Sequence, residues 1–302
     1  MGKLLVVCGP TATGKSDIAV NCALKLGSEV VSADSQLVYK GLNIGTAKPT
    51  SEEMRGIKHH MIDIVSPKSE FSVSDYMRLS EPVVDGLLKN GKIPVVCGGT
   101  GFYINSLLFD FSYGNVAADC EVRKKYEKIA EENGKEYVFN LLRSIDKETA
   151  EKLHVNDVKR VIRALEIYES SGVKKSEIRD GKKLKRNYFA VAVDYPREEL
   201  YERINLRVDK MFKNGLVDEV KKLLDGGISE NSQCMQAIGY KEVVQGLKNK
   251  DNLSTMRDII KQSTRRYAKR QITFFKQLDK IKWLSPNEAT AERILELYYN
   301  AK

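Results

Sequence analysis

The chain has 302 residues, of which 42% are hydrophobic and 30% charged, and its formal net charge is +9. This much apolar sequence can form a core, so a wholly disordered chain is excluded, and the length suggests two domains or one large domain with an insertion. The positive charge favours a polyanionic partner. None of the five cysteines lies in a C-x-x-C pair, which argues against a zinc site or a disulfide framework.

The sequence also bounds where the protein works. No run approaches 18 apolar residues, so we expect no membrane span. The first residues, Met-Gly-Lys followed by a short apolar run, lack the features of a signal peptide. We therefore expect a cytoplasmic protein with reduced thiols.

The first 112 residues alternate between short apolar runs and helical spacing. The runs typical of strands are Lys3–Cys8, Glu29–Ala33 and Ile93–Cys97, with Met61–Val65 as a further candidate. Apolar residues at helical spacing, followed by a glycine, predict helices over Ser16–Leu26 and Ser74–Asn90. This alternation predicts a parallel sheet with crossover helices.

The pattern changes near residue 113. Residues 119–171 are rich in helix-forming Glu, Lys, Ala and Leu, and we interpret the basic stretch Lys174–Arg186 as a flexible loop. A strand pattern returns at Tyr188–Val193, followed by helical sequence from Arg197 to about Leu278 and a candidate last strand at Ile281–Leu284. The predicted fold is α/β, with a parallel-sheet core over residues 1–112 and 188–302, whose C-terminal part is helical, and a helical insertion domain over residues 113–187.

A phosphate-binding motif lies between the first predicted strand and the first helix. The segment GPTATGKS matches G-x-x-x-x-G-K-[ST], so we expect phosphate to contact Gly9, Pro10, Thr11, Ala12, Thr13, Gly14, Lys15 and Ser16. Lys15 supplies a full charge beside the loop amides and the helix N-terminus, and the Ser16 hydroxyl is a candidate Mg²⁺ ligand. The strand–loop–helix context makes the predicted core P-loop NTPase-like. The motif fits ATP, GTP or a simpler diphosphate, although the lack of an N-K-x-D signature argues against a GTPase.

Two further candidate sites follow predicted strands. Asp34 comes after EVVSA, where a carboxylate can hold Mg²⁺ through water, act as a general base, or simply cap a turn. Gly98-Gly99-Thr100 follows IPVVC, and is either a close-approach site with a reactive hydroxyl or a plain tight turn. Ligands of open α/β sheets bind beyond the carboxyl ends of the strands, so we expect both segments to face the phosphate site.

Three basic segments support a nucleic-acid partner. They are Arg257–Lys276, the cluster of Lys159, Arg160 and Arg163, and the Lys174–Arg186 stretch. In the first, we expect four basic residues on one helical face with aromatic residues interleaved, at Lys261, Arg265, Lys269 and Lys276. This pattern suits an RNA backbone with unstacked bases, and it also suits a solvated helix whose aromatic side chains pack in the core.

Taken in order, seven segments resemble the tRNA dimethylallyltransferase (tRNA isopentenyltransferase) family in its compact bacterial form. They are GPTATGKS at 9–16, DSQLVYKGLNIGTAKP at 34–49, HHMIDIV at 59–65, GGTGFY at 98–103, NDVKRVIRALEIY at 156–168, QAIGYKE at 236–242 and RYAKRQITFF at 266–275. The family transfers a dimethylallyl group from dimethylallyl diphosphate to N6 of the adenosine 3′-adjacent to the tRNA anticodon. The resemblance therefore implies the anticodon stem-loop of tRNA and dimethylallyl diphosphate as partners and Mg²⁺ as cofactor. Contact with one stem-loop from two parts of the chain is consistent with a monomer, and a weak dimer stays open.

The resemblance also implies roles for single residues. Asp34 would take the proton of the amine, and Thr100 would orient the reacting groups. Lys15 and Arg207 would hold the diphosphate leaving group. The residues implied in tRNA binding are Asp34, Ser35, Gln36, Leu37, Thr100, Arg123, Lys159, Arg160, Val161, Ile162, Arg163, Gln236, Ala237, Ile238, Gly239, Tyr240 and Lys241.

The sequence departs from the family pattern in two places and leaves two other functions open. Many members read D-S-M-Q-[VI]-Y, whereas here Gln36 comes one position earlier and Leu37 follows; Phe274 stands where a Trp is common. A P-loop kinase of a small molecule or nucleotide would share the loop and Asp34 but would turn over ATP without tRNA. A non-catalytic RNA-binding protein switched by nucleotide would bind ATP or GTP tightly and transfer no prenyl group.

Overall fold

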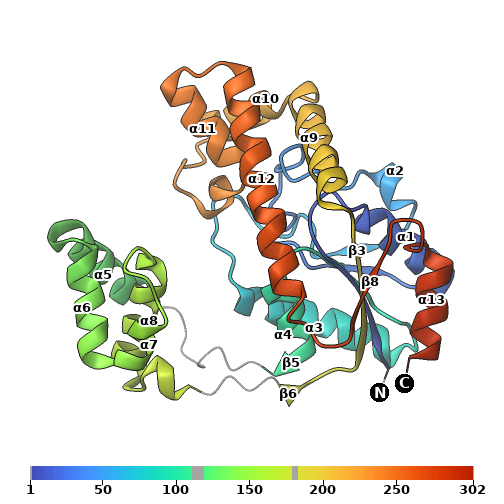
Figure 1. Ribbon diagram of the computed structural model, residues 1–302, viewed down its shortest axis with the longest axis horizontal. Helices are drawn as coiled ribbons and strands as arrows, with labels where there is room; N and C mark the ends of the chain where they lie inside the picture. Colours follow the sequence, from blue (N-terminus) through green and yellow to red (C-terminus); the bar gives the residue numbers. More distant parts are fainter. Residues whose placement is uncertain (1, 111–118, 179–182, 302) are drawn as a thin grey trace. The chain divides into compact units, whose positions relative to one another are not determined.

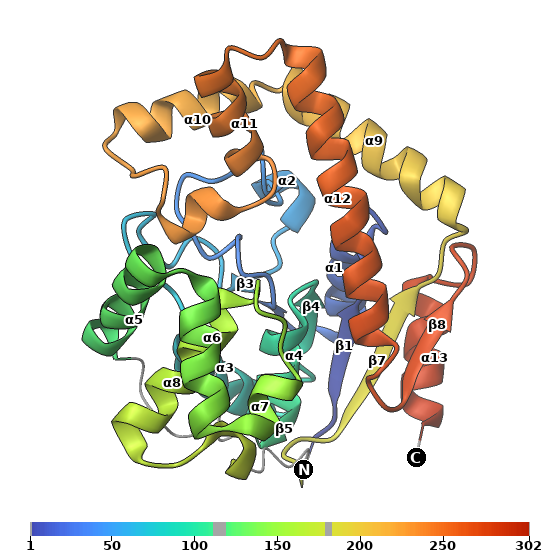
Figure 2. The same cartoon turned by 60° about the vertical axis from the view of Figure 1, so that its left-hand side comes forward.

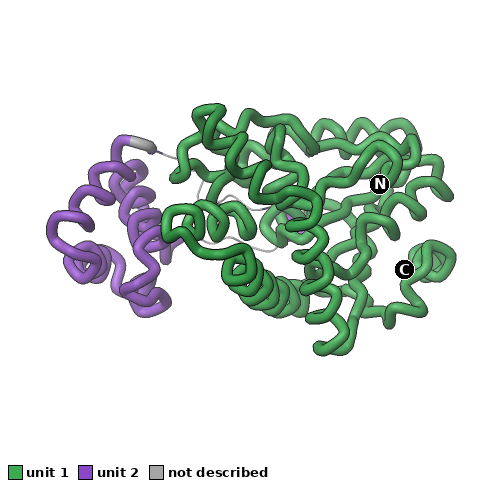
Figure 3. Tube along the Cα trace, turned by 90° about the horizontal axis from the view of Figure 1, so that it is seen from above, with its two compact units in different colours: residues 1–108, 185–302 green, residues 109–184 purple. Residues whose placement is uncertain are grey.

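The computed structural model describes residues 2–110, 119–178 and 183–301 (Figure 1). The chain divides into two compact units (Figure 3): unit 1 is residues 1–108 with 185–302, and unit 2 is residues 109–184. The predicted boundaries, after residues 112 and 187, lie a few residues further along the chain. The first of them falls outside the described residues.

Unit 1 is built on a six-stranded sheet in the order β3-β2-β4-β1-β7-β8, and every pairing in it is parallel. The strands are β1 Leu4–Cys8, β2 Val30–Ser32, β3 His59–His60, β4 Val95–Gly98, β7 Tyr188–Val193 and β8 Ile281–Leu284. All residues of β1, β2, β4 and β7 are buried, as expected for continuous apolar runs in a sheet covered on both faces. The predicted α/β fold with a parallel-sheet core is confirmed.

Helices cover both faces of this sheet (Figures 1 and 2). Helices α1 (Lys15–Leu26) and α13 (Ala291–Asn300) pack together on one face, over a cluster that contains Leu5 and Val7 of β1. Helices α3 (Val73–Lys89) and α4 (Gly101–Leu108) lie on the other, where the rings of Tyr76 and Tyr103 stack at 4.0 Å. This packing against the sheet explains why apolar residues recur at helical spacing in these helices.

The C-terminal half of unit 1 is helical. It contains α9 Arg197–Lys213, α10 Leu216–Asp225, η2 Gln233–Gln236, α11 Tyr240–Asn249 and the long helix α12 Leu253–Phe275. Helices α9 and α12 pack against each other through Leu200, Ile204 and Ala268. A short helix, α2 (Ser51–Met54), begins at Thr50 with a capping box completed by Glu53.

Unit 2 is a helical unit with a small two-stranded sheet. Its elements are β5 Phe109–Asp110, α5 Cys120–Asn133, α6 Lys135–Ile145, α7 Lys147–Glu151, α8 Val158–Ser171, η1 Lys175–Glu177 and β6 Lys183–Leu184. Helices α5, α6 and α8 pack around Leu142, Val161 and Leu165. The predicted loop at Lys174–Arg186 is wrong where η1 and β6 form, because β6 pairs with the distant β5, a tertiary contact that the basic sequence does not reveal. Residues 179–182 of that prediction lie outside the described residues.

Most predicted elements are confirmed to within a few residues, and β7 and β8 match their predicted ranges. The predicted strand at Met61–Val65 is wrong, because the strand is His59–His60 and the backbone then turns, with φ of 65° at Met61 and 53° at Asp63. Helices α4 and α13 form where no element is expected from the sequence. Among the helices of the described part of the chain, none has both the length and the apolar character to span a bilayer.

Candidate active site

The phosphate motif forms a loop between β1 and α1 that only a glycine-rich sequence can follow. Gly9 and Gly14 have φ of 117° and 81°, and a side chain at Gly9 would lie 3.2 Å from the Cβ of Ala192. Ala12 also has a positive φ of 66°, and its carbonyl accepts a hydrogen bond of 2.8 Å from the Nε of Arg203 on α9. Thr13 closes the loop by donating its hydroxyl to the carbonyl of Pro10 (2.9 Å).

Lys15 reaches back across this loop. Its Nζ donates to the carbonyl of Pro10 at 3.0 Å. Burial is the main cause that lowers the pKa of Lys15, and the charge of Arg207 lowers it further, while Cys97 and Asp34 act in the opposite direction. A bound anion would stabilise the charged ammonium in this position.

Gln271 of α12 connects the phosphate loop to the end of β4. Its amide oxygen accepts the backbone N–H of Thr11 (2.9 Å), and its amide nitrogen donates to the carbonyl of Gly99 (2.9 Å). The side chain is buried, and a Cβ at Gly99 would lie 2.2 Å from its Nε2. Gly99 therefore has to be a glycine for this contact to form. No pattern in the sequence assigns a role to Gln271.

Asp34 and Thr100 lie together beyond the ends of the neighbouring strands β2 and β4. Asp34 Oδ1 accepts the N–H of Gln36 (2.9 Å), and Thr100 Oγ1 accepts the N–H of Ser35 (2.9 Å). The two strand ends approach so closely that a Cβ at Gly98 would lie 2.1 Å from the carbonyl oxygen of Ala33. One oxygen of Asp34 thus caps a turn, one of the interpretations open from the sequence, while its half-buried carboxyl also lines a pocket.

Tyr267 of α12 joins this group. Burial is the main cause that raises its pKa to about 12, and the nearby charge of Asp34 contributes; Thr100 and Gln271 are hydrogen-bonding neighbours. The phenol is therefore protonated at neutral pH and can donate a hydrogen bond at the site. From the sequence, Tyr267 is an aromatic residue interleaved along a basic helix and part of the segment RYAKRQITFF, and neither pattern assigns it a role.

Arg207 of α9 lies far from the phosphate loop in sequence but at the same pocket in space. Its Nη2 donates to the carbonyl of Thr46 at 3.1 Å. Burial lowers the pKa of Arg207, and the charges of Asp34 and Glu53 counter this effect. Because an arginine stays charged in proteins, Arg207 places a permanent cation beside Lys15 at the site.

Two adjoining pockets in unit 1 contain these groups. The first is lined by Lys15, Ser16, Leu37 and Cys97, and the second by Ser35, Gln36, Gln236, Ala237 and Ile238; Asp34, Arg207 and Tyr267 line both. The amide oxygen of Gln36 is buried without a hydrogen-bond partner in the described part of the chain. Asp34 therefore lies where a ligand held by the phosphate loop would meet a ligand in the second pocket.

Several residues predicted to contact RNA have structural roles within unit 2. Val161 and Ile162 are buried in the core of unit 2 with almost no exposed surface, and their contact with RNA stays a prediction. Arg123 and Arg163 of the same unit form ion pairs with the fully buried Glu166, at 3.2 and 2.9 Å. They neutralise a buried charge there.

Other predicted contacts are divided between surface and core. Lys159 and Arg160 are exposed on α8, and Gln236 and Lys241 are exposed in unit 1. Gly239 has φ of 98° before α11. Tyr240 is fully buried and its hydroxyl donates to Glu219 (2.6 Å), so its contact with RNA stays a prediction.

The predicted basic face of α12 lies partly against another helix. Lys261 pairs with Asp209 (2.7 Å) and Arg265 donates to Asn205 (2.7 Å), both on α9, because these positions face that helix. Phe275 is buried. The exposed cations of this stretch are Arg266, Lys269, Arg270 and Lys276.

The donors at the phosphate loop fit a magnesium ion that is held largely by its ligand. Ser16 is exposed at the start of α1, beside Lys15. Within the described residues, no group of three or more His, Cys, Asp or Glu side chains could hold a metal. Mg²⁺ commonly keeps several waters and binds substrate phosphates with few protein ligands, so Ser16 suits that role.

Family models and relatives agree with this arrangement. The chain matches the model described as IPP transferase over residues 37–278 and that described as isopentenyl transferase over residues 2–69. The chain belongs to the tRNA dimethylallyltransferase family. Members of that name include proteins of Acetivibrio thermocellus, 44% identical over 95% of this chain and 93% of the relative, and of Caldanaerobacter subterraneus, 46% identical over 93% and 91%.

Solved structures of family members share the fold. The tRNA isopentenylpyrophosphate transferase of Bacillus halodurans superposes with a TM-score of 0.74 at 38% identity, covering 99% of this chain and 95% of that one. A eukaryotic dimethylallyltransferase, crystallised in a study of its action on tRNA, gives a TM-score of 0.84 at 28% identity and covers 100% and 81%. The predicted family and its P-loop NTPase-like fold are confirmed.

Proposed function

We propose that the protein transfers a dimethylallyl group from dimethylallyl diphosphate to N6 of the adenosine 3′-adjacent to the anticodon of tRNA. Family membership and the names of its relatives support prenyl transfer to tRNA. The observation that carries the mechanism is the position of Asp34, which lines both the pocket of the phosphate loop and the pocket beside it. Each pocket would hold one of the two substrates.

The phosphate loop would bind the diphosphate as a leaving group. When the bond between the allylic carbon and the diphosphate oxygen breaks, the electron pair stays on that oxygen and negative charge grows there. Lys15 and Arg207 line the pocket, and these two side chains together with free loop amides would stabilise this charge. Ser16 would hold Mg²⁺, which would supply further positive charge beside the diphosphate.

Asp34 would serve as the general base. The lone pair of the amine is delocalised into the purine, so N6 becomes a better nucleophile as its proton leaves. As the new C–N bond forms, the proton passes from N6 to the carboxylate of Asp34. Thr100 and Tyr267 flank this carboxylate and would orient the amine and the diphosphate.

The adenine has to leave its stack to reach Asp34. The second pocket would receive it, where the unpartnered amide oxygen of Gln36 is an acceptor for a base N–H. Exposed cations on both units would contact the phosphates of the anticodon stem-loop: Lys159 and Arg160 in unit 2, Arg266 and Lys269 in unit 1. The monomeric state and the cytoplasmic location stay predictions.

A transfer assay tests this proposal. The chain is incubated with Mg²⁺, unmodified tRNA and dimethylallyl diphosphate labelled in the prenyl group. The expected result is label in tRNA at the adenosine beside the anticodon. Label that stays out of tRNA, together with transfer of the γ-phosphate of ATP to a small molecule, would contradict the proposal and favour a kinase.

A further inference from the structure

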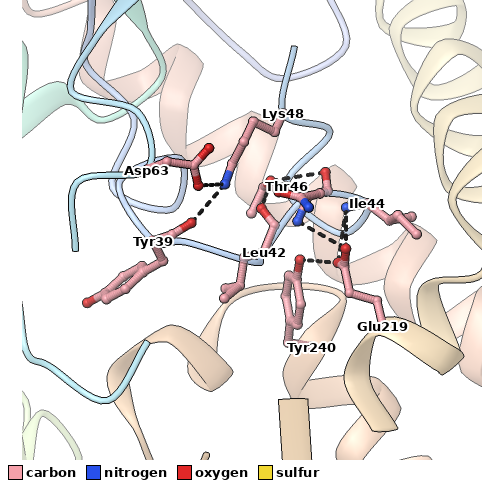
Figure 4. A network of polar contacts seen from close by, with 9 residues as sticks. Tyr39, Leu42, Ile44, Thr46, Lys48, Asp63, Glu219 and Tyr240 are labelled. Atoms are coloured by element: carbon pink, nitrogen blue, oxygen red, sulfur yellow. Dashed lines mark hydrogen bonds and ion pairs between the residues drawn. The ribbon is translucent and has the colours of Figure 1, made fainter. Parts of the chain in front are cut away.

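A short turn over Leu42–Lys48 forms part of the wall of the first pocket, through Thr46 and Ala47. The turn closes on itself, because the Thr46 hydroxyl donates to the carbonyl of Leu42 (2.7 Å) and the N–H of Lys48 donates to the carbonyl of Asn43 (2.9 Å). Lys48 anchors one end by donating its Nζ to the carbonyl of Tyr39 (2.8 Å) and by pairing with Asp63 (Figure 4).

Glu219, in the first turn of α10, is the second anchor of this turn (Figure 4). Its carboxylate accepts the backbone N–H groups of Asn43 (3.1 Å), Ile44 (2.8 Å) and Gly45 (3.2 Å). Successive backbone N–H groups that converge on one point form an anion-binding concavity. Here the protein fills that concavity with its own carboxylate.

Tyr240 fixes the position of this carboxylate. Its hydroxyl donates to Glu219 Oε1 at 2.6 Å, and its ring is fully buried. The ring packs directly under the turn, since a Cβ at Gly45 would lie 2.4 Å from its Cε2. Glu219 is half-buried, and four hydrogen bonds from three backbone N–H groups and the Tyr240 hydroxyl hold its carboxylate, so the turn has little freedom to move relative to α10 and α11.

This anchor leads to the active site. The carbonyl of Thr46, one residue beyond the clamped N–H groups, accepts the hydrogen bond from Arg207 (3.1 Å). We propose that Glu219 is a positioning residue for prenyl transfer: it fixes the turn whose Thr46 carbonyl aims the Arg207 guanidinium at the diphosphate. The proposal rests on the proposed function. Asp34 is held separately, by β2 and its own turn. A variant can therefore disturb the binding of diphosphate without disturbing the proposed base.

The variant Glu219→Gln tests the proposal, with Asp218→Asn as its matched control. Both remove one acid from the first turn of α10, and Asp218 is exposed. Binding of inorganic diphosphate is measured by calorimetry, beside the KM for dimethylallyl diphosphate, kcat and tRNA binding. We expect Glu219→Gln to weaken diphosphate binding and raise this KM by roughly tenfold, as for a displaced positioning contact, with smaller effects on kcat and tRNA binding. Asp218→Asn should resemble the wild type.

A double-variant cycle separates positioning from general loss of structure. In an Arg207→Ala background, Glu219→Gln should weaken diphosphate binding no further, because Glu219 acts through Arg207. A further tenfold loss in that background, or unchanged binding in Glu219→Gln alone, would overturn the proposal. If Glu219→Gln does not fold, Tyr240→Phe replaces it as the test variant, because it removes one hydrogen bond to the carboxylate and keeps the ring. We then expect a smaller rise in the KM for dimethylallyl diphosphate.

The measurement also separates this inference from the proposed function. Diphosphate binding can be followed whether or not any prenyl group is transferred. A wild-type chain that binds diphosphate but leaves tRNA unlabelled would contradict the proposed function alone. The comparison of Glu219→Gln with Asp218→Asn would still decide whether Glu219 positions Arg207.

Discussion

At the scale of single residues, the site depends on buried polar side chains that hold backbone segments together. Gln271 is the clearest case, because one amide satisfies the N–H of Thr11 and the carbonyl of Gly99. A buried backbone group without a partner costs about 1–3 kcal/mol. The phosphate loop and the end of β4 therefore depend on a residue that makes no proposed contact with substrate.

We predict that Gln271→Leu destabilises the protein by about 2 kcal/mol, because it leaves both backbone groups unpaired. It should also raise the KM for dimethylallyl diphosphate, since Thr11 belongs to the phosphate loop. Denaturant unfolding and steady-state kinetics check the two effects. The control is Gln262→Leu at an exposed position of α12, and a Gln271→Leu variant as stable as this control would contradict the prediction.

The motif residues could be predicted from the sequence, and their supporting partners could not. Lys15 and Ser16 stand at fixed positions of a phosphate-binding pattern, and Asp34 follows an apolar run that predicts a strand end. Gln271 and Tyr267 lie more than 200 residues further along, and their place at the site depends on how α12 packs against α9 and α4. Single-sequence patterns carry no information on that packing.

At the scale of elements, an ion cluster ties β2 to its two neighbours in the sheet. Glu29 precedes β2 and bonds to His60 of β3 (2.6 Å) and to Lys92, shortly before β4 (2.8 Å). The hydrogen bonds from Lys92 and His60 lower the pKa of Glu29 to about 2. This cluster fixes the start of the strand that carries Asp34 at its far end.

The cluster predicts a pH dependence of stability. In the unfolded chain Glu29 takes up a proton near its ordinary pKa of about 4.5, while in the native protein it stays ionised to about pH 2. Its contribution is therefore complete above about pH 4.5 and is lost as the pH falls towards 2. The Tm of the wild type should exceed that of Glu29→Gln at about pH 6, and the difference should shrink steadily below about pH 4.5. A difference that stays constant down to about pH 2.5 would be incompatible with this cluster.

The sequence of a helix does not reveal which of its faces packs against the rest of the protein. The sequence predicts α12 as a basic helix, but which of its cations face solvent depends on α9. Lys261 and Arg265 face that helix and pair with Asp209 and Asn205. Charge spacing gives no sign of this packing, so the sequence alone does not show which cations are exposed.

At the scale of the whole molecule, the alternation of strands and helices was sufficient to predict a parallel α/β core and a helical insertion. The strand order was not predictable, because it depends on long-range pairing: β1 lies between β4 and β7, which come about 90 and 180 residues later. The net charge of +9 was informative about the class of partner. How much unpaired positive charge each unit presents to solvent follows only from which cations form ion pairs.

Exposed cations of unit 2 predict a salt effect on tRNA binding. Changing Lys159 and Arg160 together to Ala should weaken tRNA binding. It should also make the fall of log K with log salt less steep, by about 0.7–0.9 in slope for each phosphate that is no longer neutralised. Binding titrations between about 50 and 200 mM salt would measure this slope. Lys25→Ala, at a cation that pairs with Glu292 on α13, is the control. Equal slopes in the double variant and the control would show that α8 does not bind the phosphates.

The proposed mechanism requires Asp34 to take the proton of the tRNA amine while the phosphate loop holds the leaving diphosphate. Its sharpest test is single-turnover transfer of labelled dimethylallyl groups to unmodified tRNA by the wild type and by Asp34→Asn, with tRNA and diphosphate binding measured on the same preparations. General bases contribute about 10²–10⁴-fold to rate. We predict a loss of that order in the transfer step with both binding affinities largely kept. Transfer by Asp34→Asn at close to the wild-type rate would contradict the assignment of Asp34 as the base.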